Sequence, residues 1–197
     1  MRLHDFFNYH VRENPNSAFA AMGDPTLTYG EASKQINRLA NAFASSGIKK
    51  GDRVAFLSKN SIEYALMYYA GARSGVVPVP LNYRLVPRKW AFIINDSRAK
   101  MLIASPEYLE AVDGVRPELE TTSKYVSVGG AASPGWADFK EWIGAQPESA
   151  PEEYISADDD LLQMYTSGTT GQPKGVALTH GSVTANLVQT FSELTMP

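Results

Sequence analysis

Four apolar runs decide the fold: Val54-Ala55-Phe56-Leu57, Val76-Val77-Pro78-Val79, Lys100-Met101-Leu102-Ile103 and Tyr125-Val126-Ser127-Val128. Each run has the character of a short strand, and the segments between them, 61–73, 87–95 and 107–112, have a helical pattern. Nearly continuous apolar strands that alternate with helices are typical of a parallel sheet buried on both faces. The sequence therefore predicts an α/β fold, with a mostly parallel sheet and helices on both faces.

The first fifty residues follow a different pattern. A short helix is predicted over 3–13, and Gly23-Asp24-Pro25 favours a turn between two short extended runs. Thr28 and Glu31 form a capping-box pattern at the start of a second helix, which ends near Gly47. The apolar face of this helix consists of Ile36, Leu39, Ala40 and Phe43. We divide the chain into an N-terminal extension of helix, hairpin and helix, 1–50, and an α/β subdomain, 51–197.

Composition and charge exclude several classes of function. The net charge of −3, with lysine and arginine dispersed, disfavours binding to nucleic acid, and the absence of cysteine excludes disulfides and thiolate metal sites. The acidic segment 144–160 contains no basic residue and is predicted to be a solvated linker. The first residues lack the pattern of a signal peptide, and Arg73, Pro78 and Pro80 interrupt the most apolar stretch. We expect a cytoplasmic protein without a transmembrane segment.

A polar loop, 166–175, lies between two predicted strands at 161–165 and 176–178. It reads Thr166-Ser167-Gly168-Thr169-Thr170-Gly171-Gln172-Pro173-Lys174-Gly175. Its three glycines would let backbone N–H groups approach an anion, its hydroxyls can donate to phosphate oxygens, and Lys174 adds positive charge. A plain glycine-rich hairpin turn needs no such collection of hydroxyls beside a lysine. Neither a Walker loop nor a dinucleotide-binding fingerprint is present, so the composition favours a polyphosphate cradle of another kind.

The segment from Tyr165 to Val176 closely resembles the signature loop of the adenylate-forming superfamily. That superfamily contains acyl- and aryl-CoA ligases, firefly luciferase and the adenylation domains of nonribosomal peptide synthetases. Other segments are similar to its N-terminal landmarks in order and spacing: Leu27-Thr28-Tyr29-Gly30-Glu31, Gly51-Asp52-Arg53-Val54-Ala55, Gly71-Ala72, and Val79-Pro80-Leu81-Asn82 with Arg84-Leu85. The resemblance implies a reaction in two steps. A carboxylate attacks the α-phosphate of Mg-ATP to give an acyl-adenylate and pyrophosphate, and a thiol, usually of CoA, then takes the acyl group.

The resemblance also implies roles for residues of the loop, which holds the β- and γ-phosphates in that family. It assigns ATP-phosphate binding to Thr166, Ser167, Gly168, Thr169, Thr170, Gly171 and Lys174. Thr166 is further expected to contact Mg²⁺, and no catalytic residue is expected in this chain. The adenine-binding motif, ribose-binding aspartate and mobile lysine of the family lie beyond Pro197, so we expect an N-terminal portion that is inactive alone. The extension 1–50 would belong to a second sheet, and the lack of its partners predicts an exposed apolar helix face and self-association.

The leading hypothesis is an AMP-forming carboxylate–CoA ligase that uses ATP, CoA and a fatty or aryl acid. An amino-acid adenylation domain of a peptide synthetase and a non-catalytic nucleotide-binding module stay as alternatives. The carboxylic acid, the acceptor thiol and the oligomeric state are left open. Elsewhere, His4 and His10 are interpreted as surface residues and His180 as a turn or capping residue. Other side chains are expected to pack: Tyr64, Met67, Tyr68, Trp136 and Trp142. Whether Arg84 lines a cofactor channel stays open.

Overall fold

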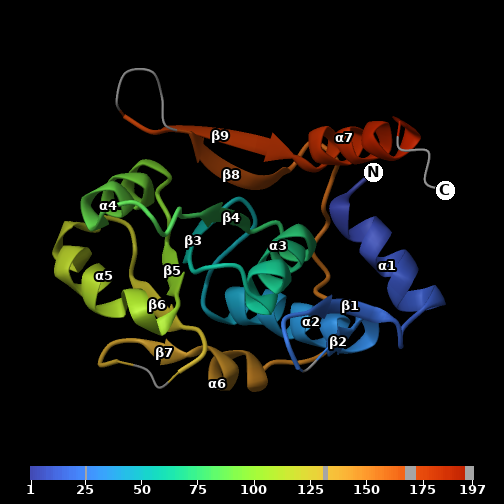
Figure 1. Ribbon diagram of the computed structural model, residues 1–197, viewed down its shortest axis with the longest axis horizontal. Helices are drawn as coiled ribbons and strands as arrows, with labels where there is room; N and C mark the ends of the chain where they lie inside the picture. The colour runs from blue at the N-terminus through green and yellow to red at the C-terminus, as the bar shows by residue number, and fades with distance from the viewer. Residues whose placement is uncertain (25, 131–132, 167–171, 194–197) are drawn as a thin grey trace.

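Figure 1 shows the computed structural model, which describes residues 1–24, 26–130, 133–166 and 172–193. Its centre is a five-stranded parallel sheet with the strand order β4-β3-β5-β6-β7. The strands are β3 (Arg53–Leu57), β4 (Val77–Pro80), β5 (Met101–Ala104), β6 (Lys124–Ser127) and β7 (Ala137–Asp138). The predicted α/β fold is confirmed, and the four apolar runs supply β3 to β6. The two-residue β7 has no counterpart among the predicted strands.

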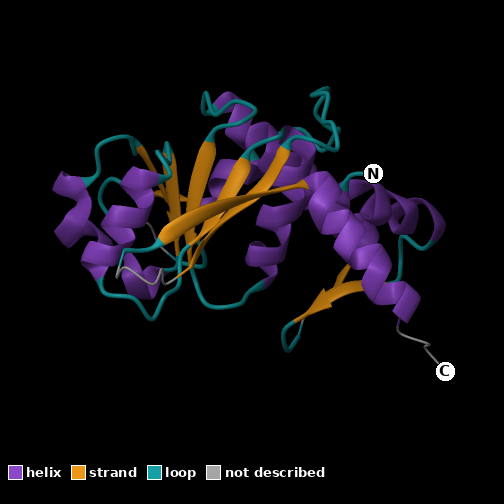
Figure 2. Ribbon diagram, turned by 90° about the horizontal axis from the view of Figure 1, so that it is seen from above, coloured by secondary structure: helices purple, strands orange, loops and turns teal. Residues whose placement is uncertain are grey.

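Helices cover both faces of this sheet (Figure 2). One face packs against α2 (Tyr29–Ser45), α3 (Ile62–Ser74) and α6 (Phe139–Gly144), and the other against α4 (Pro87–Asp96), α5 (Leu109–Val115) and two short 3-10 helices, η1 (Pro106–Tyr108) and η2 (Arg116–Glu118). Because side chains alternate along a strand, β3 sends Val54 and Phe56 into one core and Ala55 and Leu57 into the other. Within the described ranges, no helix combines the length and apolar character needed to cross a membrane.

The N-terminal segment forms the predicted helix, hairpin and helix. α1 (Leu3–Glu13) leads into β1 (Ala18–Ala21) and β2 (Thr26–Thr28), which pair antiparallel in a sheet of their own. The capping box of α2 is present, because the Thr28 hydroxyl accepts from the Glu31 N–H at 3.3 Å and the Glu31 carboxylate accepts from the Thr28 N–H at 3.0 Å. This reciprocal pair satisfies two backbone donors and starts α2 where the sequence predicts.

The apolar face of α2 is not exposed, so the predicted patch at this position is wrong. Four of its side chains are 0% exposed: Ile36, Leu39, Ala40 and Phe43. They belong to the core that α3 and α6 complete, so helices of this same chain cover the face. The buried Arg73 of α3 also donates hydrogen bonds to Asn8 of α1 and to Ser33 and Asn37 of α2. A boundary between two domains at residue 50 stays a prediction.

A second antiparallel hairpin packs against β4 and carries the loop of interest (Figure 1). It consists of β8 (Asp160–Thr166) and β9 (Lys174–Thr179), followed by α7 (His180–Glu193), which lies beside α1. The acidic linker before β8 is fixed at several points, since Glu148 pairs with Arg38 at 2.9 Å, and Asp159 pairs with Lys50 at 2.7 Å. Its Ile155 is 2% exposed, so the linker is only partly solvated.

Candidate functional site

The β8–β9 hairpin brings the two ends of the predicted phosphate loop together. Thr166, the last residue of β8, and Lys174, the first residue of β9, are partners in the strand register, and both are exposed. The remaining residues predicted to bind phosphate, Ser167, Gly168, Thr169, Thr170 and Gly171, lie outside the described residues. The structure therefore describes the two ends of the loop. There the Thr166 hydroxyl and the Lys174 ammonium group are carried by paired residues of neighbouring strands.

A chain of hydrogen bonds runs along the inner face of β8 below this loop. The Tyr165 hydroxyl donates to Asp96 Oδ2 at 2.6 Å and accepts from Gln163 Nε2 at 3.1 Å. Gln163 Oε1 accepts from Arg53 Nε at 3.1 Å, and Arg53 Nη2 pairs with Asp160 at 3.0 Å. Burial, and then the hydrogen bond to Asp96, raises the pKa of the Tyr165 phenol above its usual range. The phenol is thus a neutral donor at any physiological pH.

A small cavity of about 130 Å³ opens beside the loop. It is lined by Pro80, Asn82, Leu85, Ile93, Tyr165, Thr166 and Pro173. Small-molecule sites usually occupy about 300–1,000 Å³, so this cavity is too small to enclose a nucleotide. Its residues could form only part of the wall of such a site. Arg84, whose role was left open, does not line this cavity. Its guanidinium lies 5.6 Å from the centre of the Tyr83 ring.

The described residues offer little to a metal ion by themselves. Among them there is no group of three or more histidine, aspartate or glutamate side chains placed to hold one. The Thr166 hydroxyl is a single oxygen donor at the loop, and Mg²⁺ takes few protein ligands when phosphates supply the others. The predicted contact of Thr166 with Mg²⁺, which would arrive as Mg-ATP, stays a prediction.

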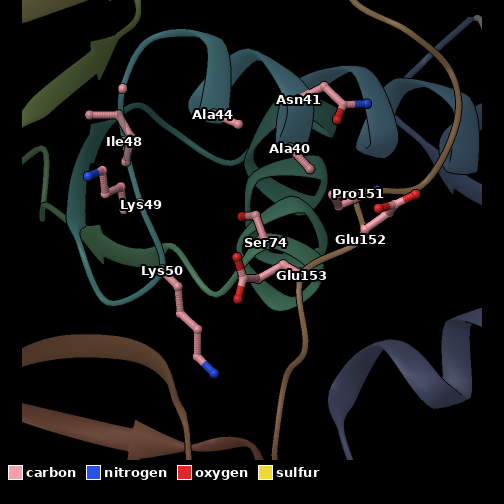
Figure 3. Close-up of a pocket in the computed structure, with 11 residues that line it drawn as sticks. Ala40, Asn41, Ala44, Ile48, Lys49, Lys50, Ser74, Pro151, Glu152 and Glu153 are labelled. Carbon is pink, nitrogen blue, oxygen red and sulfur yellow. The ribbon is translucent and has the colours of Figure 1, made fainter.

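A larger cavity, of about 600 Å³, lies between α2 and the acidic linker (Figure 3). Ala40 and Ala44 of α2 form one wall, while Glu152 and Glu153 of the linker form the opposite side. The Lys50 ammonium at its edge is already paired with Asp159. The lining contains Lys49 as well, so its two lysines are matched by its two glutamates. The cavity thus has no excess of positive charge for a polyphosphate, and the loop of β8–β9 remains the candidate site.

His10 is exposed as predicted, whereas the rings of His4 and His180 are buried. His180 opens α7, but its ring is 0% exposed and lies edge-on to His4, with ring centres 5.9 Å apart. His4 is only 7% exposed and is not the surface residue that the sequence suggested, because α7 covers it. The Leu3 N–H donates to His180 Nδ1 at 3.2 Å, and burial together with His4 lowers the pKa of His180 to about 4. The pair joins α1 to α7 and takes no part in the loop.

Four of the five residues predicted to pack do so, while Tyr68 is half-buried and contacts the ring of Tyr64, with ring centres 5.5 Å apart. Met67 is 2% exposed and Trp136 is 5% exposed, and Tyr64 and Trp142 pack against the core of α2 and α3. The hydrogen-bond chain of Tyr165 was not predicted. The one signal for it in the sequence is that Gln163 and Tyr165 alternate with apolar residues on the strand that leads into the loop.

Comparison with protein families gives a match to the model described as "AMP-binding enzyme" over residues 7–196. YdaB of Bacillus subtilis (strain 168), named as a candidate acyl-CoA ligase, is 40% identical over 182 residues, which cover 92% of this chain and 35% of YdaB. Long-chain-fatty-acid–CoA ligase FadD13 of Mycobacterium tuberculosis (strain ATCC 25618 / H37Rv) is 37% identical over 160 residues, 81% of this chain and 31% of that protein. Feruloyl-CoA synthase of Amycolatopsis sp. is 35% identical over 183 residues, with 93% and 34% covered.

Among solved structures, the anthranilate CoA ligase AuaEII in complex with anthranoyl-AMP superposes with a TM-score of 0.87 at 27% sequence identity. The superposition covers 91% of this chain and 35% of that one. The chain thus spans about a third of the length of the curated relatives it matches.

Proposed function

The chain belongs to the AMP-binding enzyme family, and from that membership we propose that the protein containing it is an ATP-dependent, AMP-forming carboxylate–CoA ligase. The observation that carries the proposal is the pairing of Thr166 with Lys174 at the mouth of the β8–β9 loop. In the first step, a carboxylate oxygen attacks the α-phosphorus of Mg-ATP, and the bond to pyrophosphate breaks. In the second step, the thiol of CoA takes the acyl group and AMP leaves.

The proposed role of the loop is to position and neutralise the leaving group. Negative charge develops on pyrophosphate as the P–O bond breaks, and we assign to the Lys174 ammonium, at the start of β9, the role of offsetting that charge. We assign the remaining hydrogen bonds to the β- and γ-phosphates to Thr166 and the loop residues 167–171. No proton transfer is assigned to this chain.

We propose a fatty or aryl acid as the carboxylate, CoA as the acceptor and the cytoplasm as the location. The named substrates of the relatives include a long-chain fatty acid, ferulate and anthranilate, which supports this range without narrowing it to fatty acid metabolism. An amino-acid adenylation domain is the second candidate, because it would use the same loop. The names of the relatives favour the ligase.

The test is pyrophosphate exchange by the full-length protein. Radiolabelled pyrophosphate is expected to enter ATP only when a suitable carboxylate is present, and AMP is the expected nucleotide product. The panel contains a long-chain fatty acid, ferulate, anthranilate and the common amino acids, followed by CoA to trap the adenylate as a thioester. Formation of ADP would contradict the AMP-forming assignment. Exchange supported only by an amino acid, without transfer to CoA, would favour the adenylation domain.

The isolated chain, 1–197, is expected to form no acyl-adenylate and to bind ATP weakly. Its described residues provide one small cavity beside the loop, and one lysine in a solvent-exposed site gains little net binding energy after screening. We expect a dissociation constant on the order of millimolar or higher, equivalent to roughly 4 kcal/mol. Calorimetry with Mg-ATP measures this value.

The molar mass of the isolated chain in solution is measured alongside. Apolar side chains are exposed on the hairpin and α7, namely Met164, Val176, Val188 and Phe191, which favours self-association. Micromolar ATP binding by a strict monomer would instead support the non-catalytic nucleotide-binding module.

A further inference from the structure

Gly175 has a steric role that its place in a glycine-rich loop conceals. It follows Lys174 and is the cross-strand partner of Tyr165. A Cβ atom at this position would lie 2.7 Å from Gln163 Nε2, 2.9 Å from Tyr165 Cζ and 3.0 Å from the Tyr165 hydroxyl oxygen. Its backbone is not in the left-handed region that favours glycine. Two side chains of β8 therefore occupy the space of a Cβ. The Gln163 amide is the end of a flexible side chain and can move aside, whereas the Tyr165 ring is held in place and is what requires glycine here.

The far end of the Tyr165 side chain is fixed as well. Its hydroxyl donates to Oδ2 of Asp96, the last residue of α4, in a short hydrogen bond of 2.6 Å. The same oxygen accepts from Gln163, which accepts in turn from Arg53 at the start of β3. The ring packs against the core of α4 and α5. Tyr165 thus connects both strands of the hairpin to the body of the α/β fold.

We propose that Tyr165 and Gly175 form a clamp at the base of the loop, which positions Thr166 and Lys174 for the phosphates of ATP. The inference deepens the proposed function and rests on it. Tyr165 directly precedes Thr166, and Gly175 directly follows Lys174, so a shift of either clamp residue moves a group assigned to the phosphates. A displacement of about 1 Å in such a group can reduce the rate as much as 100-fold. Tyr165 and Gly175 are positioning residues, since neither is assigned a contact with substrate.

The clamp predicts that the effect of a substitution at Gly175 depends on whether the Tyr165 ring is present. A direct approach of the Gly175 backbone to the phosphates predicts no such dependence. In the full-length protein, Gly175→Ala is expected to lower kcat/KM for ATP about tenfold, because the added methyl displaces the Tyr165 ring. In a Tyr165→Ala background the ring is absent and the Gln163 amide loses its bond to the Tyr165 hydroxyl and can move aside, so the same change is expected to lower kcat/KM less than about twofold further. If Gly175 serves instead to let its backbone approach the phosphates, Gly175→Ala would reduce kcat/KM equally in both backgrounds. Equal losses would overturn the clamp.

Tyr165→Phe is the milder test, because it keeps the ring and removes the bond to Asp96. We expect KM for ATP to rise about three- to tenfold while KM for the carboxylate is unchanged. Gly114→Ala and Tyr9→Phe are the matched controls. A Cβ at Gly114 meets no atom within 4 Å, and Tyr9 is 53% exposed, so neither change is expected to alter the kinetics. An unchanged KM for ATP in Tyr165→Phe would overturn the clamp.

Amide hydrogen exchange separates failure of the clamp from failure of the proposed function. Tyr165→Phe is expected to accelerate exchange across 162–166 and 174–178, a readout that needs no substrate. A wild-type protein that supports no pyrophosphate exchange would contradict the ligase assignment, while faster amide exchange in the variant would still support the clamp. Unchanged amide exchange in Tyr165→Phe would overturn the clamp whatever the enzyme does.

Discussion

Replacing Lys174 by alanine in the full-length protein is expected to lower kcat/KM for ATP in adenylation about 10- to 150-fold. The ammonium group stands at the mouth of the loop beside Thr166, and the change removes a charge-assisted contact to the departing pyrophosphate. Such a contact contributes about 1.5–3 kcal/mol, which corresponds to this range of rates. The loss should appear in both kcat and kcat/KM, because the charge on the leaving group is greatest in the transition state.

The measurement is the initial rate of pyrophosphate exchange across a range of ATP concentrations. Lys140→Ala is the control, since Lys140 is exposed on α6, far along the chain from the loop. Lys174→Arg should retain part of the activity, because it keeps the charge but not the shape of the ammonium. Kinetics of Lys174→Ala that match the wild type at every ATP concentration would show that Lys174 has no role in phosphate binding.

Acidification from pH 7 to pH 5 is expected to lower the free energy of unfolding of the chain by about 2 kcal/mol through His180 alone. Its folded pKa of about 4 lies below the ordinary histidine value of 6.5, so between these values the unfolded state binds the proton and the folded state does not. Stability from this group is therefore complete above about pH 6.5 and is lost as the pH falls toward 4. The charged groups around it have opposite effects, since Arg2 and His4 oppose its protonation and Asp5 and Asp159 favour it.

Urea unfolding at pH 7 and pH 5 tests this expectation. His180→Gln removes the titrating ring and should flatten the pH dependence, whatever it does to stability at pH 7. His10→Gln is the matched control, because it makes the same change at an exposed histidine of α1. His4 is also buried and its pKa is lowered, mainly by burial, so some dependence should persist in His180→Gln. Equal pH dependence in His180→Gln and the wild type would contradict the assignment.

The fold was predictable where the pattern is local. Apolar runs gave β3 to β6, and the Thr28–Glu31 spacing located the start of α2, because strand burial and helix capping act over a few residues. The covering of α2 was not predictable in this way. Its amphipathic face was recognised, but the sequence does not say that α3 and α6 would bury it. The order of the strands, with β3 between β4 and β5, likewise depends on contacts between distant segments.

In the candidate site, too, the features that depend on neighbouring residues were predictable and those that depend on distant residues were not. The loop could be recognised because its hydroxyls, glycines and Lys174 follow one another in the chain, and their phosphate-binding role stays a prediction. The hydrogen bond between Tyr165 and Asp96 joins residues 69 positions apart, so no local pattern indicated it. The steric role of Gly175 was hidden for another reason. A glycine in a loop suggests backbone freedom, whereas here the space it leaves is filled by a side chain from the neighbouring strand.

The contact between α1 and α7 has a consequence for the order in which the protein matures on the ribosome. The backbone N–H of Leu3 and the ring of His180 are joined across 177 positions, and Met1 accepts from the Thr184 hydroxyl across 183. Translation adds about 5–20 residues per second, so roughly 9–35 s separate the synthesis of these partners. The contacts of α1 with α7 must therefore form after those with α2 and α3 can form, and His4 lacks its His180 partner throughout that interval.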